Sequence, residues 1–556
     1  MSASEYDAVV LGAGAAGMTA AFVAAHEGAR VLLLERTACV GGTSARSAGT
    51  LWVPGNPLMP DTDAAADVEA ARRYLDALVG DRSDARLRER FLRRAPRMIR
   101  YLQGHAGLRF NPCPRHADYH PELEGARRGG RPVEPAIFDG RTLGRDFALL
   151  RPPLREFMVL GGMMVSKADI DALLALRANA SHAAALVLRY ARDRVTHRRG
   201  TRLTMGNALC GALLKALRDA GVTLLTRART VSAERVGTSA HSLIVDVDGR
   251  LRTVVATRAL VFAGGGFSAN AAWRERHLPK PAPTQTAACE AADASTLTLA
   301  LSLGAALGEP RGHNAWWFPC SSVPRADGTS GVFPHIVMDR AKPGLIAVDA
   351  RGRRFVNEGT GYHPFGLAQY ATRAIPCWLV CDSRFIRKYG LGAVRPGASG
   401  LRDWVRRGYV SEASSLDALA RAIGVDPRGL RDSAARMNAY AVSGHDPDFG
   451  KGGDALSRQN GDAAHAPNPC LGPIETPPFY AVEVRPADLG TSLGLRVDAH
   501  AQLADGDGRA LQGLYACGND MDSIMGGAYP APGVTLGPGM TFAYVAALNA
   551  LGKADD

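Results

Sequence analysis

The chain has 556 residues, of which 46% are hydrophobic and 22% are charged. This length exceeds one ordinary hydrophobic core, so we expect two or more globular domains. The net charge is +12, but the basic residues occur only in short pairs and triplets without interleaved aromatics, which argues against a nucleic-acid partner. The nine cysteines are scattered and lack the paired spacing of a zinc site, so no metal is expected.

The N-terminus predicts neither export nor membrane insertion. Its first residues, MSASEYD, include acidic side chains and lead directly into a folding motif, unlike a signal peptide. No apolar run reaches the length of a membrane span. We therefore expect a cytoplasmic protein with no transmembrane segment.

A nucleotide-binding motif opens the fold. In DAVVLGAGAAG (residues 7–17) an apolar strand runs into Gly12, Gly14 and Gly17, and a helical stretch and a second strand ending in Glu35 follow. The first glycine permits a tight turn, the second lets a pyrophosphate approach the main chain, and the third lets helix and strand pack closely. The helix N-terminus offers unpaired N–H groups to phosphate. A carboxylate at the position of Glu35 can bind a ribose diol, which argues against NADP.

Three further glycine-rich segments favour FAD over NAD. RTACVGGTSARSAGTLWVPG (36–55) forms a second close-approach loop, where a simple NAD domain would continue into another helix. RALVFAGGGFSAN (258–270) and GLYACGND (513–520) are apolar strands that end in glycine. With the strand that ends at Gly12, these make three separated strands that end in glycine, which predicts one long ligand across the edge of the sheet, and FAD matches that description.

Together these motifs resemble the flavoprotein family that includes the fumarate reductase and succinate dehydrogenase flavoprotein subunits and the 3-ketosteroid dehydrogenases. The resemblance is strongest to the 3-ketosteroid Δ1-dehydrogenases and covers nearly the whole chain. It implies FAD as the cofactor. The expected FAD-binding residues are Gly12, Gly14, Ala15, Ala16, Gly17, Glu35, Arg36, Gly41, Gly42, Thr43, Ser44, Ser47, Ala48, Gly49, Gly264, Gly265, Gly518, Asn519, Thr535 and Leu536.

The expected fold class is α/β, with a discontinuous domain. Residues 1–280 and 481–556 form a Rossmann-like FAD-binding domain, and residues 281–480 form an inserted α+β catalytic domain that binds the substrate. The inserted part is rich in prolines, tryptophans and loops, with a helical patch near 415–440. The resemblance implies the same arrangement, with the active site where the inserted domain meets the flavin.

The segment MGGAYPAPGVTLGPG keeps one phenol, Tyr529, among residues chosen for backbone shape. Pro530 and Pro532 stiffen this turn, and Gly533 presents an N–H with no side chain in the way. A phenol O–H and a nearby glycine N–H can converge on one carbonyl oxygen and stabilise an enolate. In the Δ1-dehydrogenases a similar Tyr-Pro-x-Pro-Gly segment binds the 3-keto oxygen of the substrate, so the resemblance assigns that role to Tyr529 and Gly533.

A base must accompany these donors, and RGRRFVNEGTGYHPF contains the candidates. The residues alone favour Glu358 or His363, because free tyrosine titrates at about pH 10. The resemblance instead assigns proton abstraction to Tyr362, which follows the RFVNE segment, and a supporting role to Tyr119. The sequence departs from the family where Tyr119 is followed by His120, since paired tyrosines are expected there.

We therefore expect FAD-dependent 1,2-desaturation of a 3-ketosteroid or similar apolar cyclic ketone. A proton leaves C2, a hydride passes from C1 to flavin N5, and an external electron acceptor reoxidises the enzyme. Trp316, Trp317 and Phe318 either wall the substrate pocket or form the core of the inserted domain. The alternatives are a Δ4-(5α)-desaturase or a fumarate-reductase-like enzyme with the same fold, and a flavin-binding or electron-transfer module without its own substrate.

Overall fold

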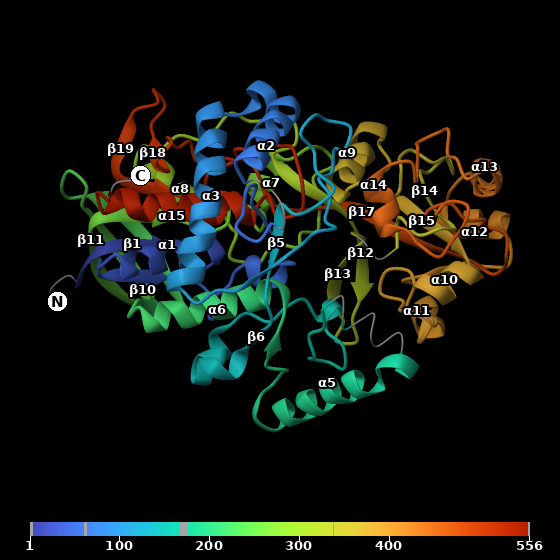
Figure 1. Cartoon of the computed structure of the whole chain (residues 1–556), viewed down its shortest axis with the longest axis horizontal. Helices are drawn as coiled ribbons and strands as arrows, with labels where there is room; N and C mark the ends of the chain where they lie inside the picture. The colour runs from blue at the N-terminus through green and yellow to red at the C-terminus, as the bar shows by residue number, and fades with distance from the viewer. Residues whose placement is uncertain (1–3, 60–63, 167–168, 170–175, 337–338, 554–556) are drawn as a thin grey trace.

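The computed structural model describes residues 4–59, 64–166, 169, 176–336 and 339–553. Two large β-sheets organise this part of the chain. Figure 1 shows both chain ends beside the first sheet at one end of the molecule, with the second sheet at the opposite end.

The first sheet carries the N-terminal glycine motif. It contains β1 (Ser4–Leu11), β2 (Val31–Leu34), β8 (Thr223–Leu225), β9 (Ala228–Arg235), β10 (His241–Val247), β11 (Arg250–Phe262), β18 (Gln502–Ala504) and β19 (Ala510–Ala516). The order is β18-β19-β11-β1-β2-β8, with β10 paired to β11 and β9 to β10. β1 is parallel to β2 and β11, and β11 is parallel to β19. This parallel core confirms the predicted α/β class.

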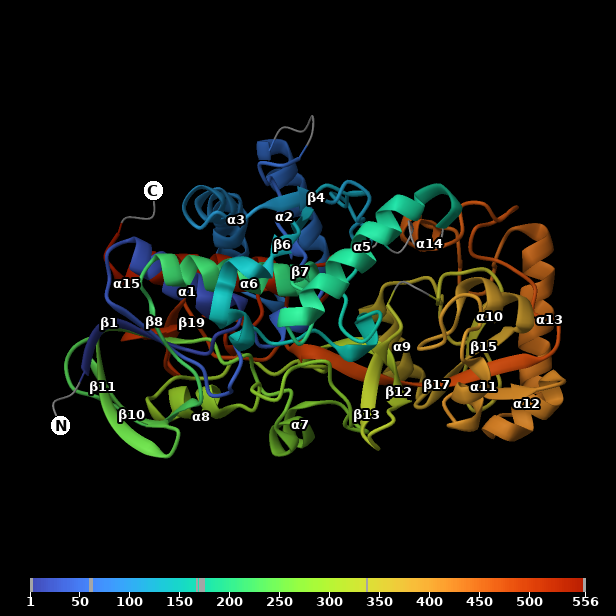
Figure 2. The same ribbon diagram turned by 90° about the horizontal axis from the view of Figure 1, so that it is seen from below.

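Helices cover the first sheet. They include α1 (Ala15–His26), α3 (Ala85–His105), α6 (Met205–Asp219) and α15 (Leu536–Ala550). α1 contacts both α6 and α15, and α15 contacts α3. The sequence of α1, AAGMTAAFVAAH, has almost no polar face, as expected for a helix enclosed by neighbouring helices. Figure 2 shows α1, α6 and α15 together on one side of the sheet.

The second sheet is antiparallel. It contains β12 (Ala315–Pro324), β13 (Ser330–Pro334), β14 (Leu345–Val348), β15 (Cys377–Asp382), β16 (Ser411–Ala413) and β17 (Phe479–Thr491). The order is β13-β12-β17-β15-β14, with β16 also paired to β17. Residues 481–491, which the sequence assigns to the returning FAD domain, therefore lie in the second sheet, and the first sheet resumes at β18. The division into domains otherwise stays a prediction.

The remaining elements are shorter or lie outside the two sheets. The helices are α2 (Ala64–Val79), α5 (Leu176–Thr196), α7 (Ala271–His277), α8 (Ser295–Ser302), α9 (Tyr362–Thr372), α10 (Ser383–Tyr389), α11 (Leu401–Arg406), α12 (Leu416–Ile423), α13 (Pro427–Ser443) and α14 (Ala455–Asn460). The short strands are β3 (Leu51–Trp52), β4 (Phe110–Pro112), β5 (Pro132–Pro135), β6 (Phe138–Asp139) and β7 (Arg202–Leu203). Among the helices described, none combines the length and the apolar character needed to cross a bilayer.

Candidate active site

The three glycines after β1 have separate structural roles. Gly12 has φ +104°, and a Cβ there would lie 2.4 Å from the Ala263 carbonyl oxygen. A Cβ at Gly17 would lie 1.9 Å from the carbonyl oxygen of Gly12, so the helix could not pack so closely on the turn. At Gly14 the nearest atom would be the Ser44 Oγ, 3.9 Å away. The second glycine therefore leaves open space beside the first turn of α1, where a phosphate group can approach the main chain.

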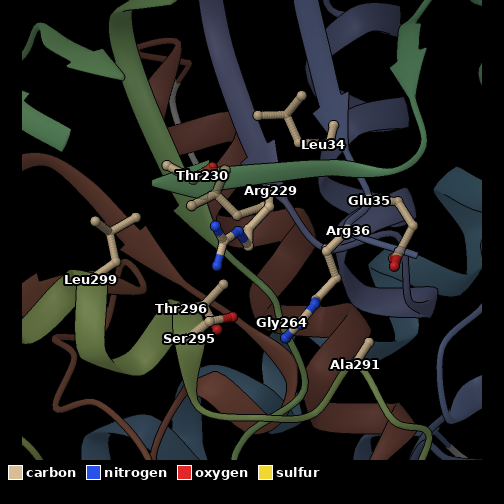
Figure 3. A pocket seen from close by; sticks show the side chains of 13 residues that line it. Leu34, Glu35, Arg36, Arg229, Thr230, Gly264, Ala291, Ser295, Thr296 and Leu299 are labelled. Carbon is tan, nitrogen blue, oxygen red and sulfur yellow. The ribbon is translucent and has the colours of Figure 1, made fainter. Parts of the chain in front are cut away.

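Glu35 follows β2 at the carboxyl edge of the first sheet. Its carboxylate accepts hydrogen bonds from the N–H of Ala13 at 3.0 Å and from the N–H and hydroxyl of Thr37 at 2.9 and 2.8 Å. It lines an open pocket of about 480 Å³. Figure 3 shows Arg36 and Arg229 extending into this pocket, and Arg36 forms an ion pair with Asp293.

The 41–49 loop is held against α1 by its own hydroxyl groups. The Ser44 Oγ accepts the Ala15 N–H at 3.2 Å, and the Thr43 Oγ1 accepts the Cys289 N–H at 3.0 Å. The Ser47 hydroxyl donates to the Ser44 carbonyl at 2.8 Å. The structure thus brings this predicted loop to the N-terminus of α1.

The other loop positions pack closely against the protein. A Cβ at Gly42 would lie 3.5 Å from the Cα of Gly14, so these two glycine turns are in close contact. Gly41 has φ +105°, and its N–H donates to the Ala13 carbonyl at 2.7 Å. Gly49, which follows Ala48, would place a Cβ 2.5 Å from the N atom of Gly206.

Asp520 is a site residue that the sequence reasoning missed. Its carboxylate is completely buried and accepts the N–H groups of Gly264 at 2.7 Å and Gly266 at 2.8 Å. Burial raises the pKa of this carboxyl group. Asp520 therefore connects the loop after β11 with the turn after β19. Its position directly after the predicted Gly518 and Asn519 is the sequence signal that could have identified it.

The C-terminal turn reaches the same region. A Cβ at Gly518 would lie 3.1 Å from the Cβ of Ala16, so the end of β19 meets the first turn of α1. Asn519 is partly buried and lies against Gly490 of β17. Thr535 is the residue before α15, and Leu536 begins that helix.

Three tyrosines from distant parts of the chain meet in one buried cluster. The Tyr362 hydroxyl donates to the Tyr529 hydroxyl at 2.9 Å. The ring centroid of Tyr119 lies 5.4 Å from that of Tyr362 and 5.9 Å from that of Tyr529. Because each phenol has one hydrogen, this direction of hydrogen bonding leaves the Tyr529 O–H available to donate to a third group.

The carbonyl group of Pro530 holds two of these segments together. It accepts the Tyr119 N–H at 2.7 Å and the Tyr74 hydroxyl, also at 2.7 Å. The Tyr74 oxygen in turn accepts the His120 N–H at 3.3 Å. Tyr74, on α2, was not singled out from the sequence, because nothing in its local pattern indicates a partner so far along the chain.

Gly533 occupies a conformation that favours glycine. Its φ is +96°, and a Cβ would lie 2.6 Å from the N atom of Trp52 in β3. Its carbonyl oxygen accepts the Trp52 N–H at 3.1 Å. Within the described residues its own N–H has no hydrogen-bond acceptor, so this donor remains available to a ligand.

Glu358 and His363, the two bases that the residues alone favoured, are both engaged in contacts with other residues. Glu358 is completely buried, bonds Arg354 at 2.8 Å through each oxygen and lies 3.6 Å from the Lys451 Nζ. The His363 Nδ1 accepts the Trp317 N–H at 3.0 Å, and its Nε2 donates to the Gly527 carbonyl at 3.1 Å. Burial lowers the pKa of His363 to about 3, so the ring is neutral and has no vacant lone pair.

Burial opposes ionisation of all three phenols. It raises the pKa of Tyr529 to about 12 and raises the pKa values of Tyr119 and Tyr362 further above their ordinary range. The hydrogen bond between Tyr362 and Tyr529 lowers the pKa of Tyr529 and raises that of Tyr362. A phenolate in this cluster therefore requires a compensating positive charge.

The aromatic residues of β12 contribute both to the hydrophobic core and to the candidate site. Trp317 and Phe318 are completely buried in the core. The Trp316 ring lies 6.3 Å from that of Tyr529, and its buried Nε1 has no partner in the described part of the chain. Such a donor indicates an additional acceptor at this place.

Comparisons with known proteins identify the family of the chain. The family model described as FAD binding domain matches residues 7–536. A 3-oxosteroid 1-dehydrogenase of Mycolicibacterium smegmatis is 34% identical over 99% of this chain and 98% of its own length. A 4-oxocyclohex-2-ene-1-carboxylate 5-dehydrogenase of Sinomonas cyclohexanicum is 33% identical over 97% of this chain and 92% of its own length.

A solved structure is equally similar. The 3-ketosteroid Δ1-dehydrogenase of Sterolibacterium denitrificans, in complex with 1,4-androstadiene-3,17-dione, is 34% identical with a TM-score of 0.90. The alignment covers 99% of this chain and 100% of that one. The chain belongs to the FAD binding domain family and is an FAD-dependent oxidoreductase.

The residues present fit FAD. Open space beside Gly14 suits a pyrophosphate, and the pocket at Glu35 lies where the ribose and adenine of a bound dinucleotide belong. Asn519 and the Trp316 ring both lie against Gly490 of β17, and the buried Trp316 Nε1 has no partner in the described part of the chain.

Proposed function

We propose that the protein desaturates a cyclic ketone next to its carbonyl group, with the 1,2-desaturation of 3-ketosteroids as its reaction. The observation that carries this proposal is the buried cluster of Tyr119, Tyr362 and Tyr529 beside an FAD site. A ketone supports this reaction because an enolate stabilises the charge left when the neighbouring carbon loses a proton.

Tyr529 and Gly533 are the proposed carbonyl-binding pair. The Tyr529 O–H has no acceptor within the tyrosine pair, and the Gly533 N–H has none in the described chain. Both groups belong to one turn, which Pro530 and the Trp52 N–H hold in place. A ketone oxygen bound there would receive two hydrogen bonds that strengthen as negative charge develops.

Tyr362 is the proposed base for the C2 proton, and Tyr119 supports it from the adjacent ring. Tyr362 is the first residue of α9 and reaches the hydroxyl of Tyr529 directly. Bound FAD would supply the acceptor for the hydride that leaves C1. We assign its pyrophosphate to the Gly12–Gly17 turn and its ribose to Glu35.

A smaller substrate is the second candidate. The relative that acts on 4-oxocyclohex-2-ene-1-carboxylate is nearly as similar to this chain as the steroid enzymes are, at 33% against 34% identity. Both substrates are cyclic ketones that lose hydrogen from adjacent carbons. The buried, aromatic surroundings of Tyr529 favour the apolar steroid over a carboxylate.

The proposal includes an electron acceptor and a cellular location. The reduced enzyme must pass two electrons to an external acceptor before another turnover. We place the protein in the cytoplasm, and the nine cysteines, all of them free thiols in the structure, accord with a reducing compartment.

The test is anaerobic mixing of the yellow holoenzyme with a panel of ketones while the flavin absorbance is recorded. 4-Androstene-3,17-dione should bleach the flavin and yield the 1,4-diene, whereas 4-oxocyclohex-2-ene-1-carboxylate should react slowly. Bleaching by the carboxylate alone would favour the second candidate. Absence of bleaching by every ketone would refute the proposed function.

A further inference from the structure

Arg340 is a buried cation that the proposed reaction does not yet use. Only 2% of its surface is exposed. Its guanidinium donates to the carbonyl oxygens of His335 at 2.5 Å, Glu358 at 2.8 Å, Thr360 at 3.1 Å and Ile336 at 3.2 Å. All four acceptors are neutral carbonyl groups.

No carboxylate of the described residues lies within salt-bridge distance of Arg340. Glu358 is paired instead with Arg354, and Asp339 bonds the His335 ring at 2.6 Å. Asp339 and Glu358 raise the pKa of Arg340, but neither carboxylate contacts the guanidinium, so they offset its desolvation only in part. Burial accordingly lowers the pKa of Arg340 to about 10, which still leaves it charged at neutral pH.

Two of the four hydrogen bonds end on the turn that delivers the proposed base. Glu358 and Thr360 precede Gly361, the residue that caps α9, and Tyr362 is the first residue of that helix. The Gly361 position is also tight, since a Cβ there would lie 3.0 Å from the Tyr119 ring. The contacts of Arg340 thus set the place of Tyr362 relative to Tyr119.

The charge of Arg340 also acts on Tyr119, one member of the tyrosine cluster. It lowers the pKa of Tyr119, whereas burial raises the pKa values of all three phenols. The other titratable groups that face the phenols are each other and the neutral His363 ring. Those facing Arg340 are Asp339, Tyr119, Glu358 and the Cys377 thiol.

We propose that Arg340 is a positioning residue for the base: it fixes the turn that carries Tyr362, and its unpaired positive charge favours the ionised form of the tyrosine cluster. This inference rests on the proposed function. It identifies the source of positive charge that a buried phenol requires to remove a proton.

The test compares Arg340→Met, which removes the charge, with Arg340→Lys, which keeps it, through the pH dependence of kcat/KM for 4-androstene-3,17-dione. Loss of the cation makes the phenol harder to ionise, so the acidic limb of the profile in Arg340→Met should move to higher pH by about one pH unit. The rate at neutral pH should fall about tenfold as a result. In Arg340→Lys the limb should stay in place, even if the absolute rate falls.

A purely structural role gives a different result. Damage to the turn alone lowers kcat/KM by the same factor at every pH, so an unmoved limb in Arg340→Met with FAD bound would overturn the inference. If Arg340→Met does not fold, Arg340→Gln provides the same comparison, because its amide is neutral and retains a donor for one carbonyl.

A second measurement needs no substrate. The ultraviolet absorbance of tyrosinate is followed against pH in the holoenzyme. Its rise should begin at higher pH in Arg340→Met than in the wild type. The same onset pH in both proteins would count against the inference. If no ketone is oxidised but this onset shifts, the role of Arg340 stands and the proposed reaction fails. If ketones are oxidised but neither the limb nor the onset moves, only the role of Arg340 fails.

Discussion

Each tyrosine of the cluster contributes one hydroxyl to a shared network. Tyr362 donates to Tyr529, and Tyr119 packs against both rings. The network is anchored through Pro530, whose carbonyl accepts from Tyr74 and from the main chain of Tyr119. A single hydroxyl can therefore be removed without disturbing the packing that holds the three rings.

Replacing Tyr529 by phenylalanine should reduce turnover about a hundredfold, because one of two carbonyl-binding donors is lost. The flavin should remain bound, since the ring still packs against Trp316. Steady-state kinetics and the flavin spectrum measure both effects. Tyr515→Phe is the matched control, because it removes a buried hydroxyl that bonds only Asn549. Equal losses in the two variants would contradict the assignment.

The buried phenols should also make stability depend on alkaline pH. Their folded-state pKa values lie above the ordinary value of about 10, so their contribution to stability is complete below about pH 10 and is lost as pH rises through the folded-state values. The melting temperature of the holoenzyme should therefore fall above about pH 10. The decline should be smaller in a Tyr119→Phe variant, and an identical decline would indicate that other groups control it.

The proline- and glycine-rich turn around Tyr529 indicated that residue, whereas Tyr119 and Tyr362 were predicted only through the family resemblance. The three tyrosines are far apart in the chain, and no local pattern distinguishes Tyr119 and Tyr362 from core residues. Residue chemistry alone favoured Glu358 and His363, which ionise more easily in water. Burial beside Arg354 and a fixed pair of hydrogen bonds remove those two from proton transfer. Tyr74, Asp520 and Arg340 act through partners that only folding brings near.

Helix α9 depends on its first turn for its position. The His363 ring links the Trp317 N–H of β12 to the Gly527 carbonyl of the C-terminal turn. Farther along, a Cβ at Gly366 would lie 2.4 Å from that of Trp317, so helix and strand are in close contact. These contacts fix the direction in which Tyr362 points.

His363→Ala should destabilise the protein by about 1–3 kcal/mol, because a buried N–H and a buried carbonyl lose their partners. The wild-type histidine has its pKa lowered to about 3, so its contribution to stability is present above the ordinary value of about 6.5 and is lost as pH falls toward 3. Melting temperatures from pH 7 to pH 4 should therefore fall more steeply in the wild type than in the variant. Parallel curves would show that His363 is not the group responsible.

Some helices and strands were easier to predict from the sequence than others. The β1–α1–β2 unit was evident because its glycines, apolar strands and terminal acid occur in a fixed order. Residues 281–480 were expected to be rich in loops, and prolines do lie inside strands of the second sheet, at Pro319 of β12 and Pro486 of β17, where proline normally argues against a strand. Tertiary packing overrides that local signal here, and both strands are largely buried.

At the scale of the whole molecule, the site lies between the two sheets. β17 pairs within the second sheet, and its last residue, Thr491, accepts the Phe267 N–H at 3.3 Å from the loop after β11. The tyrosines approach the same region from α9, from the 117–120 segment and from the C-terminal turn. This convergence explains why local motifs indicated the FAD site, whereas the contacts among the tyrosines required the structure.

The most direct test of this account is the rate at which 4-androstene-3,17-dione bleaches the flavin of Tyr362→Phe under anaerobic conditions. The account predicts that FAD stays bound and that bleaching slows at least about a hundredfold relative to the wild type, because no base removes the C2 proton. Bleaching at the wild-type rate would contradict the claim that this buried phenol performs the proton transfer.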